Sequence, residues 1–308
     1  MEFHRIAVLG AGVIGASWTA LFAASGREVV VADPGEGAEE KLYGFVEAAA
    51  STLQALGWER AGDTGRIRFV TKAAEAAEGA DFIQENAPER LEVKHRLFAE
   101  ISPVLKKEAI LASSSSGLKL SDMAKGLPDA GGLILAHPFN PPHLIPLVEL
   151  LGTQATRAGV LDRAEAFYTS LGKTCVRLNR EVTGHIANRL QAAVFREAVH
   201  LALSGVADFA EIEKAMTAGP GLRWSVMGPS TLFHLGGGAA GMEGFLKHLG
   251  DPMQSWWEDL GRPDLTPEVR AQIAKGVSAM LAGQSLTDLA AERDAAILAA
   301  LTGGRLPR

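Results

Sequence analysis

The feature that most constrains this 308-residue chain is a glycine cluster placed directly after its first apolar run. Gly10, Gly12 and Gly15 have the spacing G-x-G-x-x-G, between the apolar run FHRIAVL and the helix-like segment VIGASWTALFAAS. A second apolar run ends at Asp33. A strand, a tight glycine turn, a helix and a second strand ending in an acidic residue are typical of the dinucleotide-binding unit of a Rossmann fold.

Each residue of this unit has a physical task. Gly10 permits the tight turn, Gly12 lets a pyrophosphate approach the backbone, and Gly15 lets the helix pack against the strand. Asp33 can accept hydrogen bonds from both ribose hydroxyls and repels a 2′-phosphate. Glutamates and no arginine follow Asp33 over the next seven residues, so the sequence predicts NAD rather than NADP. The alternative is a structural turn with a capping aspartate.

The pattern of the chain changes near Arg180. Before this residue, short β-branched runs alternate with helical patterns, which indicates an α/β fold with a doubly wound, mostly parallel sheet. After it the strand signals disappear. We therefore expect an NAD-binding Rossmann domain at residues 1–180 and an all-helical C-terminal domain for substrate binding and dimerisation at residues 181–308. The expected strands lie at residues 5–10, 27–33, 66–70, 80–85, 108–115 and 131–137.

Helix boundaries in the second domain can be predicted from capping residues. A long amphipathic helix is expected to begin near Thr183 and to stop at Gly205. Thr266 precedes a proline at the first helical position, and Ser285 has an aspartate three residues later, so both are candidate N-caps. The segment GPGLRWSVMGP, rich in glycine and proline, is predicted to form an ordered loop between helices.

Composition excludes several classes of protein. The longest apolar runs fall short of the about 20 residues that a membrane helix needs, and the first strand leaves no room for a signal peptide. Cys175 is the only cysteine, which rules out an internal disulfide and agrees with a reducing compartment. The net charge is −6, without a basic cluster. We expect a cytoplasmic protein whose partner is a small molecule, with no nucleic acid, membrane or metal.

A histidine and a glutamate flank a proline-rich loop in the stretch HPFNPPHLIPLVELLG. His137 ends a predicted strand, at the carboxyl edge where ligands bind in open α/β sheets. If the loop turns the chain back, the run IPLVEL lies beside that strand and brings Glu149 to the far nitrogen of His137. A carboxylate there orients the imidazole and raises its basicity, as a general base requires. The alternative is a structural histidine; His143, in the loop, has no comparable support.

Further motifs follow the glycine turn in a fixed order: FIQENAPERLEVK, SSSSGL, HPFNPP with LVEL, and GHIANR. In this order and spacing the chain resembles the 3-hydroxyacyl-CoA dehydrogenase family through the GHIANR motif, and more loosely beyond it. The serine run, NPPHLIPLVEL and GPGLRWSVMGP are most similar to the family's free-acid branch, whose members act on acids such as L-gulonate or L-carnitine. The resemblance implies NAD-dependent oxidation of a secondary 3-hydroxyl to a ketone by hydride transfer.

The resemblance also assigns roles to residues. His137 and Glu149 match the family's catalytic pair, and Ser116 matches its substrate-contacting serine, while Ser114 replaces an asparagine that is more usual in acyl-CoA members. Asn188, in the first turns of the long helix, would hydrogen-bond the substrate oxygen. A loop serine and a helix-surface asparagine are the alternatives for Ser116 and Asn188.

Three more positions, besides His137, Glu149, Ser116 and Asn188, match the family. Glu89 and Lys94 correspond to residues that flank the nicotinamide end of the cofactor, although either is also compatible with a solvated charge. Asn140 resembles the family's loop asparagine and is expected to shape the loop. Members similar to this chain form homodimers through the C-terminal domain, so we expect the same here.

The substrate is constrained by what the chain lacks. Residues 34–65 have room for one helix and a loop, with Lys41 as the only lysine of that helix, so no clamp for the phosphates of CoA is evident. Arg223 can pair with a substrate carboxylate, or it can tie its segment to a helix C-terminus. Four aromatic residues suit a cage for a quaternary ammonium, or a core or an interface: Trp224, Phe233, Trp256 and Trp257.

Two alternatives to a free-acid dehydrogenase stay open at this point. One is a short-chain L-3-hydroxyacyl-CoA dehydrogenase. The other, of a different class, is a non-catalytic, NAD-binding structural protein of the crystallin kind. Together, Ser116, His137, Glu149 and Asn188 favour catalysis over the structural role.

Overall fold

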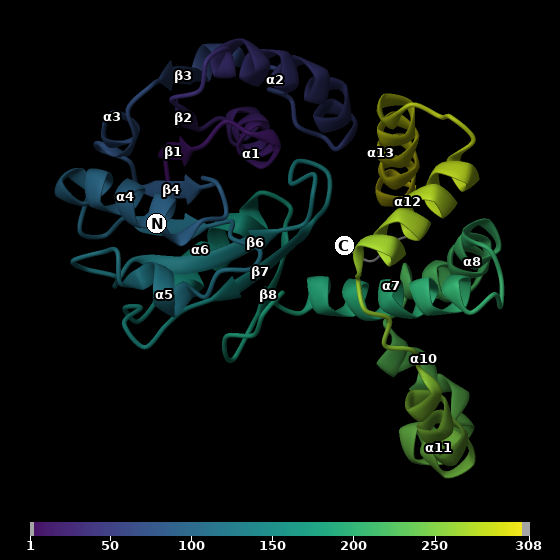
Figure 1. Ribbon diagram of the computed structural model, residues 1–308. Coiled ribbons are helices and arrows are strands. Elements are labelled where there is room, and N and C mark those ends of the chain that lie inside the picture. The colour runs from purple at the N-terminus through teal and green to yellow at the C-terminus, as the bar shows by residue number, and fades with distance from the viewer. Residues whose placement is uncertain (1–2, 304–308) are drawn as a thin grey trace. The chain divides into compact units, whose positions relative to one another are not determined.

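The computed structural model describes residues 3–303, and the chain divides into two compact units, residues 1–187 and 188–308. Figure 1 colours the first unit from purple to teal and the second from green to yellow. The expected boundary, between Arg180 and Glu181, lies slightly earlier in the chain.

The first unit is built on an eight-stranded sheet with the order β3-β2-β1-β4-β5-β6-β7-β8. Every neighbouring pair is parallel except β6 and β7, which are antiparallel. The predicted Rossmann-type α/β fold is therefore confirmed. The strands are β1 (Arg5–Leu9), β2 (Glu28–Ala32), β3 (Ile67–Val70), β4 (Phe82–Glu85), β5 (Ile110–Ser113), β6 (Leu133–Pro138), β7 (Leu147–Leu151) and β8 (Thr174–Arg177).

Two hydrophobic clusters cover the two faces of this sheet. Along β1, Ile6 and Val8 belong to one cluster and Ala7 and Leu9 to the other, as the alternation of side chains along a strand requires. Three helices pack in the first cluster: α1 (Val13–Ala24), α2 (Ala38–Ala55) and α6 (Val160–Ser170). Three others pack in the second: α3 (Ala73–Ala77), α4 (Leu91–Ile101) and α5 (Leu120–Ala124).

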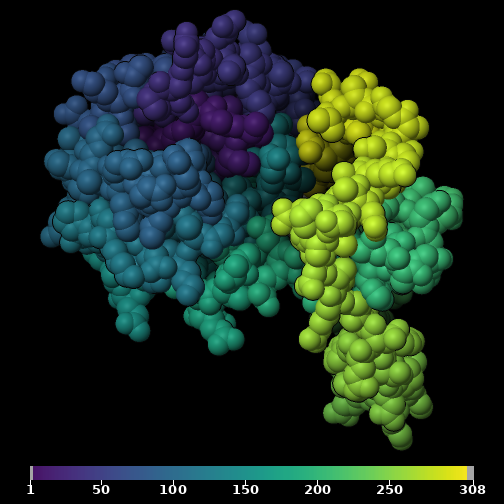
Figure 2. All heavy atoms as spheres, viewed as in Figure 1, coloured from purple at the N-terminus to yellow at the C-terminus, as the bar shows by residue number. Residues whose placement is uncertain are grey.

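The second unit is helical throughout its regular structure. The α10–α11 pair stands apart from α12 and α13 within this unit, as the ribbon and the space-filling view both show (Figures 1 and 2). The helices are α7 (Ala187–Leu203), α8 (Phe209–Met216), α9 (Leu222–Trp224), α10 (Pro229–Gly236), α11 (Gly241–Asp259), α12 (Pro267–Leu281) and α13 (Leu286–Thr302). None of the helices in residues 3–303 is long and apolar enough to cross a membrane.

The predicted caps of this unit agree with the structure. The side chain of Thr266 accepts a hydrogen bond from the Val269 amide, and that of Ser285 accepts one from the Asp288 amide. Gly205 has a φ of +75° after the end of α7, as a glycine stop requires.

One helix boundary and one loop were predicted wrongly. Helix α7 begins at Ala187 and not near Thr183, because Gly184 and His185 have φ values of +76° and +52°, outside the helical range. The stretch GPGLRW is helical and not a loop: a π-helical segment, Thr217–Gly221, joins α8 to α9. A proline inside a helix removes one hydrogen bond, and the wider π turn continues past it without ending the helix.

Candidate active site

The glycine turn after β1 fits a dinucleotide. A Cβ on Gly15 would lie 1.8 Å from the carbonyl oxygen of Gly10, and one on Gly10 would lie 2.8 Å from that of Asn86, so neither position can hold a side chain without a shift. Gly12, in contrast, would meet nothing within 4 Å. The first turn of α1 has no acidic residue and no side-chain cap, so its amides are free for a phosphate in the open space beside Gly12.

Asp33 follows β2 and lies against this turn. Its Oδ2 accepts a hydrogen bond from the Ala11 amide at 2.7 Å, and its Oδ1 accepts one from the Gly35 amide at 2.8 Å. The carboxylate is therefore held beside the glycines, where the family motif requires an acceptor for the ribose. Within residues 3–303 no group of three His, Cys, Asp or Glu side chains could hold a metal ion.

His137 and Glu149 lie side by side because β7 returns antiparallel to β6 with these two residues in register. The Nδ1 atom of His137 is 2.9 Å from Oε2 of Glu149, and the residues are only 4% and 1% exposed. Since a carboxylate only accepts, Nδ1 carries the proton and Nε2 keeps its lone pair. Ser116 Oγ lies 3.1 Å from Nε2 and donates to it.

The second carboxylate oxygen of Glu149 has partners that the sequence did not reveal. Its Oε1 accepts hydrogen bonds from the amides of Ile186 at 2.7 Å and Ala187 at 3.0 Å, at the start of α7. Burial alone would raise the pKa of Glu149, but the hydrogen bonds from His137, Ala187 and Ile186 outweigh it and hold the pKa below its usual value. Glu149 is therefore a carboxylate at neutral pH and accepts the hydrogen bond from Nδ1 of His137.

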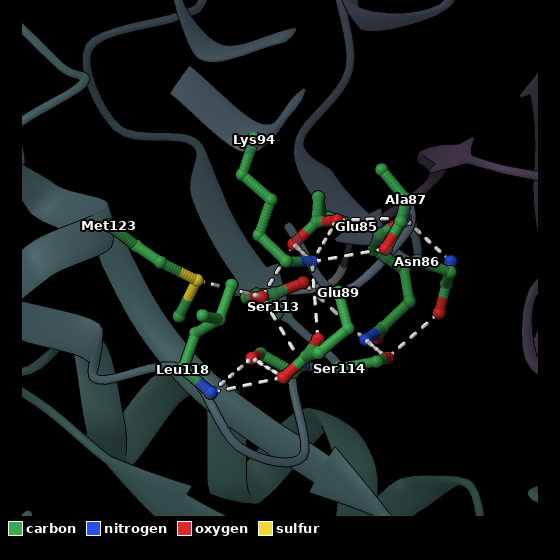
Figure 3. A network of polar contacts seen from close by, with 12 residues as sticks. Glu85, Asn86, Ala87, Glu89, Lys94, Ser113, Ser114, Leu118 and Met123 are labelled. Carbon is green, nitrogen blue, oxygen red and sulfur yellow. Dashed lines mark hydrogen bonds and ion pairs between the residues drawn. The ribbon is translucent and has the colours of Figure 1, made fainter. Parts of the chain in front are cut away.

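A buried ion pair lies beneath the loops that follow β4 and β5 (Figure 3). Nζ of Lys94 is 2.7 Å and 2.9 Å from the two carboxylate oxygens of Glu85, and it also donates to the Ala87 carbonyl at 3.2 Å. Ser113 Oγ donates to Glu85 at 2.5 Å. Lys94 is 1% exposed and Glu85 is fully buried, so the alternative of a solvated charge at Lys94 is wrong. Sequence reasoning missed Glu85, the last residue of β4.

Glu89 holds the serine loop, residues 113–118, against this network (Figure 3). Its Oε1 accepts three hydrogen bonds, from Ser115 Oγ at 2.6 Å and from the amides of Gly117 at 2.7 Å and Leu118 at 3.0 Å. Burial raises the pKa of Glu89, but these three bonds and the charge of Lys94 outweigh it and lower the pKa overall. Glu89 therefore orders the loop that carries Ser116.

The proline loop after His137 is held by hydrogen bonds to α1 and to Lys173. His143 Nδ1 lies 2.8 Å from Ser17 Oγ on α1, and buried Lys173 donates to the carbonyls of Pro142 and Ile145. Burial lowers the pKa of Lys173 to about 7. Asn140 is exposed and precedes the cis peptide bond to Pro141, consistent with a loop-shaping position.

Two predicted site residues belong to the second unit. Asn188 is the second residue of α7, within its first turn as predicted. Arg223 lies in α9, with an exposed side chain that makes no hydrogen bond or ion pair to the described residues 3–303.

A glycine turn for a dinucleotide, together with an oriented histidine at the carboxyl edge of the same sheet, defines a Rossmann-fold dehydrogenase. The family model for the NAD-binding domain of 3-hydroxyacyl-CoA dehydrogenase matches residues 5–182, and that for the C-terminal domain matches residues 184–265. The chain belongs to the 3-hydroxyacyl-CoA dehydrogenase family. It is an NAD-dependent dehydrogenase that acts on CH–OH groups.

Individual relatives and solved structures are similar to this chain over nearly its whole length. The chain is 42% identical to L-carnitine dehydrogenase of Nocardiopsis dassonvillei, over 96% of this chain and 90% of the relative. It is also 42% identical to L-carnitine dehydrogenase of Streptomyces coelicolor, over 98% and 96%. Among solved structures, 5-formyl-3-hydroxy-2-methylpyridine 4-carboxylic acid 5-dehydrogenase, an NAD+ dependent dismutase, has a TM-score of 0.84 with 26% identity, over 98% of this chain and 99% of that one.

Proposed function

We propose that this enzyme oxidises the 3-hydroxyl of a small, free L-3-hydroxy acid, and that L-carnitine is the first substrate to test. The observation that carries the proposal is the buried contact between His137 Nδ1 and Glu149 at 2.9 Å, which leaves Nε2 available as a base. The identity of 42% to two L-carnitine dehydrogenases supports the substrate class.

The reaction breaks the O–H and C–H bonds of one carbinol group. When NAD is bound, it supplies the hydride acceptor. Nε2 of His137 takes the hydroxyl proton, and Glu149 stabilises the resulting imidazolium through Nδ1. Ser116 exchanges its hydrogen bond with His137 for one with the substrate oxygen, and Asn188 donates to the same oxygen.

The cofactor would be held by the glycine turn and Asp33. Gly10 and Gly15 bring strand, turn and helix close together, and the open space beside Gly12 admits the pyrophosphate. Asp33 would bind the ribose hydroxyls in exchange for its present backbone contacts, and it favours NAD over NADP. Lys94 would support the nicotinamide end of the site through its ion pair with Glu85, and Glu89 would flank the nicotinamide.

Three features favour a free acid over a CoA thioester. Residues 38–55 form one helix, α2, with Lys41 as its only basic residue, so the chain offers no evident clamp for the phosphates of CoA. Arg223 is an exposed guanidinium available to a substrate carboxylate. Trp256 and Trp257 are 59% and 63% exposed, so they are not core residues and remain candidates for contact with a quaternary ammonium.

An assay of NADH formation tests the proposal. L-carnitine, L-gulonate, L-3-hydroxybutyrate and 3-hydroxybutyryl-CoA would each be offered with NAD+ and, separately, with NADP+. We expect the highest kcat/KM with a free acid and NAD+. Preference for the thioester would make the protein a short-chain L-3-hydroxyacyl-CoA dehydrogenase, and binding of NADH without turnover of any substrate would indicate a crystallin-like structural protein.

We also propose that the functional unit is a homodimer formed through the second unit. A groove of about 760 Å³ crosses α7, α8 and α9, and its lining is mostly apolar. Leu190, Phe195 and Trp224 line it and are 62%, 50% and 39% exposed. An apolar surface of this kind on one protomer is suited to burial against the same surface of a second copy.

A further inference from the structure

His185 is a second buried imidazole beside the proposed pair, and none of the roles above uses it. Its ring centroid lies 4.9 Å from that of His137, and the residue is 5% exposed. The Nε2 atom is 3.1 Å from the carbonyl oxygen of Ser115. Because a carbonyl only accepts, Nε2 carries the proton. Nδ1 is buried without a hydrogen-bond partner among the described residues, so it holds a lone pair in the neutral ring.

The backbone of His185 is in a conformation that L-residues rarely adopt. Its φ is +52°, directly after Gly184 at +76°. Such a residue persists only where its surroundings impose the conformation, and positions of this kind gather at functional sites. Here the turn sends the ring of His185 to the serine loop and the amides of Ile186 and Ala187 to Glu149. One short segment therefore contacts Glu149, a partner of His137, and Ser115, the neighbour in sequence of its other partner.

We propose that His185 is a positioning residue that holds Ser116 against Nε2 of His137, a role that rests on the proposed function. Apart from His185 and from the Ser116–His137 contact itself, residues 115–118 are held to another part of the chain by Glu89, whose three bonds all meet a single oxygen. The side chain of Glu89 is 43% exposed, so this anchor lies at the surface. The bond from buried His185 to the Ser115 carbonyl is a second anchor, one residue from Ser116.

The charge state of His185 suits this position. Burial lowers its pKa, as does the charge of His137, against the opposing effects of the bond to Ser115 and of the carboxylates of Glu149 and Glu89. The net shift is downward, so the ring is neutral at neutral pH. When a proton reaches His137, the neighbouring ring at 4.9 Å therefore adds no second positive charge.

Two substitutions separate positioning from simple packing. His185→Phe keeps a ring of similar size but removes the donor, whereas the terminal amide of His185→Gln can still donate to the Ser115 carbonyl. We expect kcat to fall on the order of tenfold to a hundredfold in the Phe variant, with the KM for NAD+ unchanged, and to stay near wild type in the Gln variant. Equal loss in both variants, or normal turnover in the Phe variant, would overturn the proposal.

A matched control and a readout without turnover complete the test. His95 makes the same kind of bond, from Nε2 to the Asp122 carbonyl at 2.8 Å, so His95→Phe should leave kcat unchanged. Crystal structures of the full-length His185 variants provide the second readout. The distance from Ser116 Oγ to His137 Nε2 should exceed about 3.5 Å in the Phe variant and stay near 3.1 Å in the Gln variant. An unchanged distance from Ser116 Oγ to His137 Nε2 in the Phe variant refutes the positioning role of His185, even if the wild-type enzyme oxidises none of the hydroxy acids tested.

Discussion

The two units of the chain differ in how completely they bury their own apolar surface. The first packs apolar side chains on both faces of its sheet. In the second, only Val199 and Phe245 are buried among the described apolar side chains. Conversely, among residues 3–303, all but two of the exposed large apolar side chains, Val13 and Ile186, lie in the second unit. The first unit therefore carries its own core and the His137–Glu149 pair, whereas the second leaves large apolar side chains exposed, which supports the proposed dimer.

The largest effect should come from the histidine–glutamate pair of the first unit. His137→Gln should lower kcat by about 10²- to 10⁴-fold, because it removes the base while leaving the glycine turn intact. NADH binding, measured by fluorescence titration, should stay close to wild type. Substantial turnover in this variant would remove His137 from the mechanism.

The contrast between the units also predicts a change in oligomeric state. Phe195→Glu places a charge in the apolar groove of the second unit and should convert the dimer to a monomer, with a lower Tm, since burial of an unpaired charge at an interface is strongly unfavourable. Light scattering at micromolar concentration checks the mass. Leu286→Glu, at a position that is 83% exposed and outside the groove, should remain dimeric. A monomeric wild type would contradict the interpretation of this surface.

Arg223 tests whether the second unit also recognises substrate. Arg223→Met should raise the KM for a carboxylate substrate by on the order of tenfold, because a charge-assisted hydrogen bond contributes about 1.5–3 kcal/mol. The Tm should hardly move, since the guanidinium makes no bond to the described residues. Arg262→Met, at another exposed arginine of the unit, is the control. A normal KM with a lower Tm would make Arg223 structural and reopen the acyl-CoA alternative.

Asp33 tests cofactor choice in the first unit. Asp33→Ala should weaken NAD+ binding by roughly tenfold, because two hydrogen bonds to the ribose are lost, and should narrow the preference over NADP+. Glu36→Ala, three residues later on the exposed surface, should change neither quantity. Equal use of NAD+ and NADP+ by the wild type would be incompatible with this role.

The smallest effect concerns stability. Because the pKa of Glu149 is held below its usual value in the folded state, its ionisation stabilises the fold above the ordinary carboxyl range, and this contribution is lost as the pH falls through the folded pKa. The free energy of unfolding of Glu149→Gln should therefore be lower than that of wild type at neutral pH, and the difference should shrink in acid. Urea denaturation at several pH values measures it, and a difference independent of pH would contradict the expectation.

Much of the fold could be predicted because its signals are local. The glycine spacing, the β-branched runs and the caps at Thr266 and Ser285 each depend on a few neighbouring residues, and the structure agrees with them. The prediction failed at Thr183 and at GPGLRW for the opposite reason. The positive φ of His185 accompanies bonds from its ring to Ser115 and from the next amide to Glu149, both distant in sequence. Pro220 lies inside a π-helical turn, where glycine and proline locally favour a loop.

The sequence by itself determined the fold class, the family and the antiparallel return that brings Glu149 beside His137. Only the tertiary structure decided what surrounds them: the His185 ring on the Ser115 carbonyl, 70 residues away, and the Lys94–Glu85 pair beneath the serine loop. These groups are polar and buried, and the two members of each pair lie on different segments of the chain, so no local period marks them. Their places follow from hydrogen bonds that burial makes obligatory, and such bonds exist only once the sheet has brought its loops together.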